Sequence, residues 1–391
     1  MMRWINGKSI CSIILILLFA VYSCRHTDGE FARVIKQLEL LPSTTAKTVI
    51  DSLLAQAQNI PLVVDATTAH FLYRGNVSSV ALAGDANGWD PTANKFRPIG
   101  DTDLWHFSAN YPANARLEYK LVIDDTVWVL DPLNKQQVTG GVGINSELRM
   151  PHYVMPPDRE YYARFPAGNI IDTTFYSKHL ANSRLIEIYL PPGYDDSHRQ
   201  YPLALFHDGH EYLELALADG ILNELIATNR ITPVIAVFVT PVDRTAEYAG
   251  ESISTYGKFL IDELLPWVDA RYRISTDPEL RAVIGASNGG NISLWLGFNY
   301  PTVFGMVAAQ SSNVEPSIAQ EYASAPKRDI TLYMDLGLYD IPILLPRVRN
   351  FIPILEEQGY LFSYAEYPEG HNWRFWHAHV PDILVQFFPA Q

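Results

Sequence analysis

The chain has 391 residues, 48% of them hydrophobic and 12% aromatic, which is typical of globular domains with a large core and excludes a disordered chain. The formal net charge of -14 argues against nucleic acid as a partner, because an acidic surface repels phosphate backbones. The two cysteines, Cys11 and Cys24, lie in the first 24 residues, which excludes disulfides, zinc–thiolate sites and cysteine nucleophiles from the folded body.

Residues 1–23 are typical of an export signal peptide. Arg3 and Lys8 form a positive start, and a mostly apolar run over 9–22 follows that is too short to span a bilayer. The residues around Ser23 and Cys24 resemble a bacterial lipoprotein cleavage site, which predicts a lipid anchor on Cys24. A plain secretory signal is the alternative. Both place the protein outside the cytoplasm, and the anchor would hold it in the cell envelope, in the periplasm or at the outer membrane.

Residues 24–60 carry apolar side chains at helical spacing on both sides of Pro42, which predicts two short packing helices. Residues 61–150 consist of short alternating segments separated by turn residues, the pattern of a small all-β, immunoglobulin-like sandwich. Residues 151–171 contain several prolines without clear periodicity and are predicted to be a linker.

Residues 172–391 alternate apolar strands with amphipathic helices. This pattern predicts an α/β domain whose mostly parallel sheet is covered by helices on both faces. In such sheets the chemistry gathers beyond the carboxyl ends of the strands.

The strongest local motif is Gly285–Gly290, which lies between a predicted strand over 281–284 and a predicted helix starting at Gly290. Small residues on both sides of Ser287 suit a nucleophile elbow, a tight turn that presents a serine hydroxyl at a helix N-terminus. Ser287 is therefore the predicted nucleophile. A serine hydroxyl needs a base, and His371 follows the last predicted strand, where such a base is expected.

Two other histidines, His377 and His379, lie on the predicted final helix without a carboxylate or thiolate at ligand spacing. Packing or surface roles are expected for them, and no metal is predicted. The acid that orients His371 is expected after the penultimate strand, where Asp340 is favoured over its rival Asp335, which lies on the strand itself. The predicted oxyanion donors are the backbone N–H groups of Asn288 and His210.

The catalytic part of the chain, from about Asp172 onward, resembles the putative-esterase family of enterochelin esterases, feruloyl esterases and mycolyltransferases. The motifs that carry this resemblance are Tyr189–Tyr194, His207–Gly209, Arg244 with Glu247, Glu263–Pro266, Gly285–Gly290 and Gly370–Trp373. The resemblance implies the α/β-hydrolase fold, a triad of Ser287, Asp340 and His371, and no cofactor.

The front domain is similar to the glycogen-binding-type β-sandwich found beside starch enzymes. The residues concerned are Ala83–Asp90, Leu104–Trp105, Glu118–Lys120, Trp128 and Asp131–Pro132. The similarity implies a sugar-binding face made of Trp89, Lys120 and Trp128, because an exposed tryptophan stacks on a sugar ring. The alternative is that this domain only packs on the esterase domain and shapes its cleft.

The sequence thus predicts a serine carboxylic ester hydrolase that works through an acyl-enzyme. Its expected substrates are aromatic or acetyl esters of polysaccharides, with a catecholate trilactone siderophore as the alternative. Trp373 and Trp376, close to His371, are expected either to stack on an aromatic acyl group or to pack the helix. An acyltransferase and a non-catalytic glycan-binding lipoprotein are the alternatives from other classes.

Overall fold

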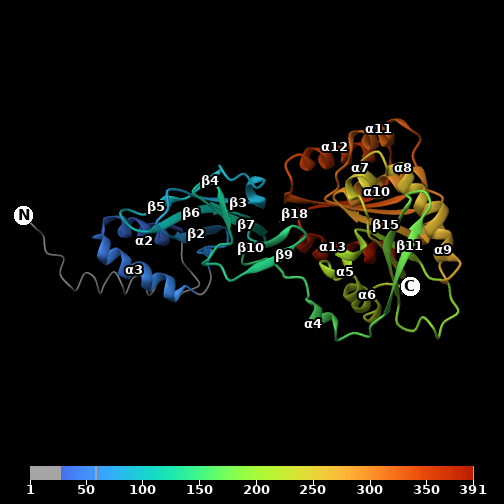
Figure 1. Cartoon of the computed structure of the whole chain (residues 1–391), viewed down its shortest axis with the longest axis horizontal. Helices are drawn as coiled ribbons and strands as arrows, with labels where there is room; N and C mark the ends of the chain where they lie inside the picture. The colour runs from blue at the N-terminus through green and yellow to red at the C-terminus, as the bar shows by residue number, and fades with distance from the viewer. Residues whose placement is uncertain (1–27, 58–59, 391) are drawn as a thin grey trace, which may run out of the picture. The chain divides into compact units, whose positions relative to one another are not determined.

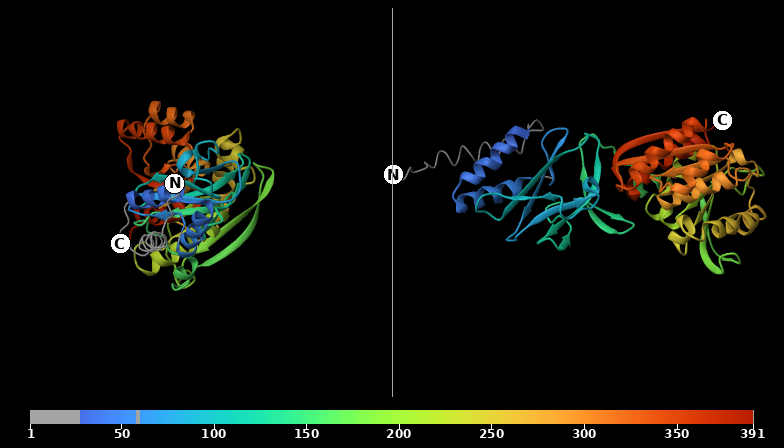
Figure 2. Two further views of the ribbon diagram at one scale, coloured as in Figure 1. Left: turned by 90° about the vertical axis from the view of Figure 1, so that its left-hand side faces the viewer. Right: turned by 90° about the horizontal axis from the view of Figure 1, so that it is seen from above.

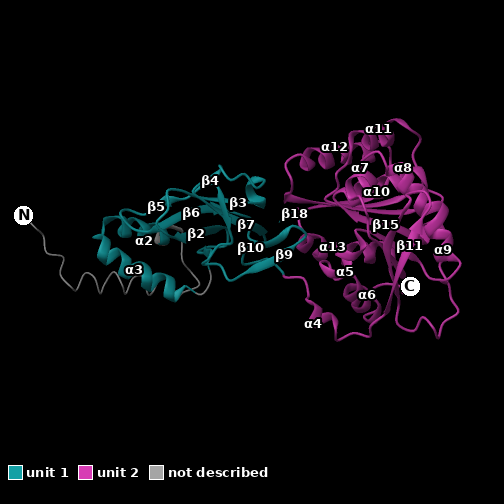
Figure 3. Ribbon diagram, viewed as in Figure 1, with its two compact units in different colours: residues 1–154, 368–370 teal, residues 155–367, 371–391 magenta. Residues whose placement is uncertain are grey.

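The computed structural model describes residues 28–57 and 60–390, so the predicted export signal and Cys24 lie outside the described residues. The described residues form two compact units (Figure 3): unit 1 extends to Val154 and includes Pro368–Gly370, and unit 2 comprises Met155–Tyr367 and the described residues from His371 onward. The division after Val154 falls within the segment predicted as a linker. Within the described ranges, no helix is long and apolar enough to cross a membrane.

Unit 1 begins with two helices, α2 (Asp28–Leu40) and α3 (Ser43–Gln56), at the positions where helical spacing was predicted. Sheet A is antiparallel and has the strand order β1 (Leu62–Val63), β2 (Thr68–Arg74), β6 (Leu104–Asn110) and β5 (Arg97–Pro98). Figures 1 and 2 show both helices lying together beside this sheet. The contact buries apolar side chains from the helices and the sheet, among them Ile35, Leu38, Ile50, Leu72 and Leu104.

Sheet B of unit 1 is also antiparallel and is centred on β7 (Arg116–Ile123). Its other strands are β3 (Val80–Gly84), β4 (Asn94–Lys95), β8 (Val127–Val129), β9 (Gln137–Gly140) and β10 (Gly143–Arg149). Phe71 of β2 meets Tyr119 of β7 edge-on, with ring centroids 5.2 Å apart, so aromatic side chains fill the space between the two sheets.

Two buried imidazoles lie between sheet A and α2. His70 Nδ1 is 3.0 Å from His106 Nε2, and the ring of Phe31 packs on His70 at 4.4 Å. Burial lowers the pKa of His106 from 6.5 to about 3, and the charges of His70 and Arg97 add to the shift. Between pH 6.5 and about 3, the unfolded chain therefore binds a proton at His106 that the folded chain does not. The stability from this site is complete above pH 6.5 and is lost as the pH falls towards 3.

The variant His106→Gln should remove this pH dependence. Between about pH 7.5 and 5, the unfolding free energy of sheet A in the unmodified protein should fall by about 2 kcal/mol more than that of the variant. Hydrogen exchange of the β2 and β6 amides measures this free energy at each pH. Equal pH slopes in the two proteins would show that His106 ionises as freely in the folded state as in the unfolded chain.

Unit 2 is an α/β domain with a mostly parallel sheet. The strand order is β11 (Asn169–Ser177), β12 (Asn182–Leu190), β14 (Ile235–Val239), β13 (Leu203–His207), β15 (Arg281–Ala286), β16 (Met306–Gln310), β17 (Thr331–Tyr339) and β18 (Leu361–Gly370). β11, β12 and β14 pair antiparallel, whereas β14, β13, β15, β16 and β17 pair parallel.

Helices cover both faces of this sheet, so its central strands are buried on both sides. Alternate residues of one strand enter different cores: Leu203 and Leu205 belong to one, and Ala204 and Phe206 belong to the other. The first core includes α10 (Asn288–Asn299), α11 (Pro316–Ser324) and α12 (Leu344–Glu357). The second includes α5 (Gly209–Glu214), α6 (Ala218–Ala227) and α13 (Trp373–Phe387). The predicted α/β fold is confirmed.

Candidate active site

Ser287 is the single residue between β15 and α10, at the carboxyl end of the central strand. Its backbone has φ 58° and ψ -120°, a conformation that is rare for residues with a side chain. A Cβ on Gly285 would lie 2.3 Å from the backbone of Gly289, so only glycine allows the chain to turn this tightly. The backbone therefore has the geometry of a nucleophile elbow, with the serine at the N-terminus of a helix.

His371 lies between β18 and α13, and its Nδ1 is 2.7 Å from Oδ1 of Asp340. Asp340 directly follows β17 and is almost fully buried, and its Oδ1 also accepts a hydrogen bond from the N–H of Ile341 at 2.7 Å. This contact fixes the imidazole with a proton on Nδ1, which leaves Nε2 as the atom that accepts a proton. The structure thus brings together the predicted base and the favoured acid.

Asp335, the rival acid, is fully buried within β17 and has other partners. Its Oδ2 accepts a hydrogen bond from Gln310 Nε2, and its Oδ1 accepts one from the N–H of Ser311, both at 3.1 Å. Burial raises the pKa of Asp335 to about 6. This carboxyl joins β17 to the end of β16.

The two predicted oxyanion donors differ in their surroundings. Asn288 is the first residue of α10, so its N–H is one of the four that a helix leaves without an internal partner. The N–H of His210 donates to the hydroxyl of Thr240, 3.3 Å away, a partner that the sequence did not indicate. The imidazole of His210 is half exposed, with Nδ1 3.3 Å from Oε1 of Glu187. Burial raises the pKa of Glu187.

An ion pair holds the loop after β13 against the elbow. Arg244 binds both carboxylate oxygens of Asp208, at 2.7 and 2.8 Å, and donates to the carbonyl oxygen of Ala286 at 3.1 Å. A Cβ on Gly289 would lie 3.1 Å from Asp208 Oδ2, so the loop and the elbow are in close contact. Burial raises the pKa of Asp208, and the guanidinium opposes this shift.

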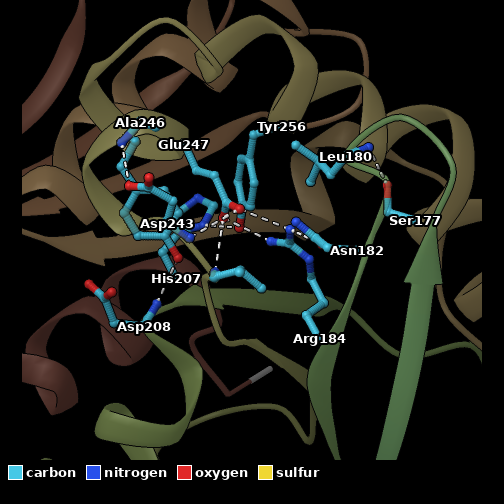
Figure 4. A network of polar contacts seen from close by, with 12 residues as sticks. Ser177, Leu180, Asn182, Arg184, His207, Asp208, Asp243, Ala246, Glu247 and Tyr256 are labelled. Atoms are coloured by element: carbon cyan, nitrogen blue, oxygen red, sulfur yellow. Dashed lines mark hydrogen bonds and ion pairs between the residues drawn. The ribbon is translucent and has the colours of Figure 1, made fainter.

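A second buried ion pair anchors α7 (Arg244–Ala249), the helix that carries Arg244. Figure 4 shows Arg184 of β12 facing Glu247, and both guanidinium–carboxylate bonds measure 2.9 Å. Beside it, His207 Nδ1 lies 3.1 Å from the hydroxyl of Tyr256. Burial lowers the pKa of His207 to about 3, so this imidazole is neutral. His207 and Glu247 belong to the motifs that carry the family resemblance, but their partners Tyr256 and Arg184 were not predicted from the sequence.

Trp373 and Trp376 are buried on the first turn of α13, with 9% and 5% of their surfaces exposed. The rings of Trp376 and His371 meet edge-on at 5.0 Å, and those of Trp373 and Tyr212 do so at 5.2 Å. Trp376 thus packs on His371, and Trp373 packs on Tyr212 and on Trp376, at 4.7 Å. Packing is one of the two roles that the sequence left open.

His377 and His379 of α13 have partners within unit 2. His377 is buried, with Nε2 3.4 Å from the hydroxyl of Tyr162, and burial lowers its pKa to about 3. His379 Nδ1 lies 2.9 Å from Oδ2 of Asp382. In the part of the chain that the structure describes, no cluster of three or more metal-ligating side chains occurs.

The three predicted sugar-binding residues all lie in or beside sheet B of unit 1. Lys120 pairs with Ala83 and Trp128 pairs with Val122, and because Lys120 and Val122 are two residues apart on one strand, these side chains share one face. Trp128 is 44% exposed. Trp89 is half-buried, and its Nε1 donates to Oδ1 of the buried Asp85 at 3.1 Å.

Residues 177–387 match the family described as putative esterase, which is more than half of the chain. The chain belongs to this esterase family. An iron(III) enterobactin esterase of Escherichia coli O6:H1 is 28% identical over 244 residues, covering 55% of this chain and 59% of that protein. An endo-1,4-beta-xylanase/feruloyl esterase of Xylanibacter ruminicola is 28% identical over 163 residues, covering 38% of this chain and 22% of that protein.

A solved structure of the enterobactin esterase from Shigella flexneri superposes on this esterase-family chain with a TM-score of 0.69. It covers 86% of this chain and 97% of its own, at 19% identity. A ferulic acid esterase superposes with a TM-score of 0.52 at 21% identity, covering 57% of this chain and 99% of its own. These likenesses show the fold of the esterase family.

Proposed function

We propose that this esterase works through Ser287, His371 and Asp340. Ser287 Oγ attacks the ester carbonyl carbon while His371 Nε2 takes the hydroxyl proton, and Asp340 holds the imidazolium through Nδ1–H. The backbone N–H of Asn288 stabilises the oxyanion, and that of His210 joins it by exchanging the hydroxyl of Thr240 for the oxyanion. The alcohol leaves with the proton from His371, and water, activated by the same nitrogen, then releases the acid from the acyl-enzyme.

One observation carries this proposal: the 2.7 Å contact between His371 and Asp340, in a unit that also holds Ser287 at an elbow with φ 58°. A solvated surface pair would not need a buried carboxylate, whereas a triad does. Ser287 also follows a central strand, at the carboxyl ends of the parallel strands, where active sites of this fold class form.

For the substrate, we propose an ester with an aromatic or other apolar acyl group. The segment around Asp340 exposes Leu338, Ile341 and Ile343, which offer apolar contacts beside the proposed triad. Similarity to an enterobactin esterase and to a feruloyl esterase supports aromatic esters, either on a polysaccharide or in a catecholate trilactone. The test is hydrolysis of p-nitrophenyl acetate, methyl ferulate and a catecholate trilactone by the chain from residue 25 onward. Failure to cleave any of them contradicts the proposal.

For unit 1, we propose that the face carrying Lys120 and Trp128 binds sugar. Replacing Trp128 with alanine should weaken glycan binding about tenfold, because the exposed ring supplies the stacking surface. Affinity electrophoresis in gels containing glycogen or xylan measures the binding. Ester hydrolysis by the same variant is the control for its fold. Equal migration of the variant and the unmodified protein in every glycan gel would contradict sugar binding at this face.

We also propose that Cys24 carries the lipid anchor. The variant Cys24→Ser should move the protein from the membrane fraction to the soluble fraction, because the thiol that would receive the diacylglyceryl group is absent. Metabolic labelling with a radioactive fatty acid gives the second readout, with Cys11→Ser as the matched control. Labelling of the Cys24→Ser variant would overturn the assignment.

A further inference from the structure

The end of β16 and the loop that follows it bind both backbone groups of Ser287. The N–H of Ser287 donates to the carbonyl oxygen of Gln310 at 2.8 Å. The carbonyl oxygen of Ser287 accepts from the N–H of Asn313 at 3.0 Å and from that of Asn291, in the first turn of α10, at 3.1 Å. That carbonyl belongs to the same planar peptide group as the N–H of Asn288, and the two point in opposite directions. Holding the carbonyl therefore fixes the direction in which the Asn288 N–H points.

The side chain of Asn313 makes a second link, to the side chain of Asn288. Its Nδ2 donates to Oδ1 of Asn288 at 2.8 Å and to Oε1 of Glu315 at 3.0 Å. Its Oδ1 accepts a hydrogen bond from the guanidinium of Arg347, which also contacts Oε1 of Glu315 at 3.0 Å. A guanidinium only donates and a carboxylate only accepts, so these partners define the orientation of the Asn313 amide.

We propose that Asn313 and Arg347 are positioning residues for the oxyanion donor of this esterase. Asn313 holds the carbonyl oxygen of Ser287 with its backbone N–H and the side chain of Asn288 with its amide, and Arg347 holds that amide in the orientation that this requires. Arg347 lies on α12, seven residues after Asp340 in the sequence. Hydrogen bonds from Arg347 to Asn313 and from Asn313 to Asn288 therefore link this helix to the elbow. This inference rests on the proposed serine mechanism, in which the N–H of Asn288 receives the developing negative charge.

The expected signature is a loss in the transition state and not in substrate binding. Asn313→Ala and Arg347→Met should each lower kcat about tenfold to a hundredfold with KM changed by less than about threefold, because a misaligned donor weakens only the interaction with the oxyanion. The kcat of the double variant should be about that of the less active single variant, since Arg347 acts through Asn313 and the two losses do not add.

The experiment measures kcat and KM of the four proteins on the preferred ester, together with the inhibition constant of an aryl trifluoromethyl ketone, whose hemiketal adduct carries an oxyanion. The inhibition constant should rise by the same factor as kcat/KM falls. Asn299→Ala, at the far end of α10, and Arg349→Met, which breaks only a surface pair with Glu366, are the matched controls and should match the unmodified protein. Circular dichroism checks folding, and Arg347→Met alone decides the question if Asn313→Ala does not fold.

The outcomes separate this inference from the function on which it rests. If the unmodified protein hydrolyses no ester, the proposed function falls and the inference falls with it. If the unmodified protein is active and both variants keep kcat and the inhibition constant within about twofold, only the positioning role is overturned. A rise in KM with kcat unchanged also overturns it, because that pattern means a loss of uniform binding.

Discussion

Replacing Ser287 with alanine should lower kcat/KM for ester hydrolysis by at least about a thousandfold, the size expected when a covalent nucleophile is removed. The hydroxyl lies at the turn between β15 and α10, and the residues next to it in sequence, Ala286 and Asn288, carry no hydroxyl. The measurement is steady-state hydrolysis of the ester that the unmodified protein cleaves best. Labelling by a fluorophosphonate, which reacts with activated serines, should disappear in the same variant.

Ser324→Ala is the matched control for this experiment. Ser324 is exposed at the end of α11, and its hydroxyl only donates back to the carbonyl oxygen of Gln320. The rate and the labelling should be those of the unmodified protein. Residual hydrolysis by Ser287→Ala at more than about a tenth of the unmodified rate would mean that another group attacks the ester, and the serine mechanism would have to be abandoned.

The parts of the site that the sequence predicted are those marked by local patterns. Ser287 is flanked by glycines at a boundary between a strand and a helix, and the structure places it between β15 and α10. His371 follows an apolar strand near the end of the chain, and the structure places it there. The alternation of apolar strands with amphipathic helices likewise predicted the parallel sheet, because burial on both faces demands that pattern.

The parts that the sequence did not predict depend on contacts between distant segments. Arg244 is 36 residues from Asp208, and Arg184 is 63 residues from Glu247. Nothing in the residues around either partner specifies the other, because an ion pair requires only that the fold bring two side chains together. The role of Asn313 was not predictable for the same reason, since an asparagine in a loop after a strand is an ordinary turn residue.

The choice of Asp340 over Asp335 as the acid can be tested by replacing each with asparagine. Asp340→Asn keeps the shape of the side chain, yet it should lower kcat about a thousandfold to ten-thousandfold, because an amide in place of the carboxylate favours the wrong tautomer of His371. Asp335→Asn should change kcat by less than about tenfold, because this carboxyl contacts Gln310 and Ser311 and not the imidazole. Thermal unfolding of both variants separates a loss of fold from a loss of chemistry.

The comparison between the two variants is informative whichever one is impaired. Asp335 lies only five residues before Asp340, within β17, and both carboxyls are buried, so general damage to this region should affect both variants similarly. A large loss confined to Asp340→Asn is explained by the 2.7 Å contact with His371 Nδ1. A large loss confined to Asp335→Asn, with its unfolding temperature unchanged, would mean that the imidazole changes partner during catalysis. Near-normal rates in both would reduce the machinery to Ser287 and His371 acting without an acid.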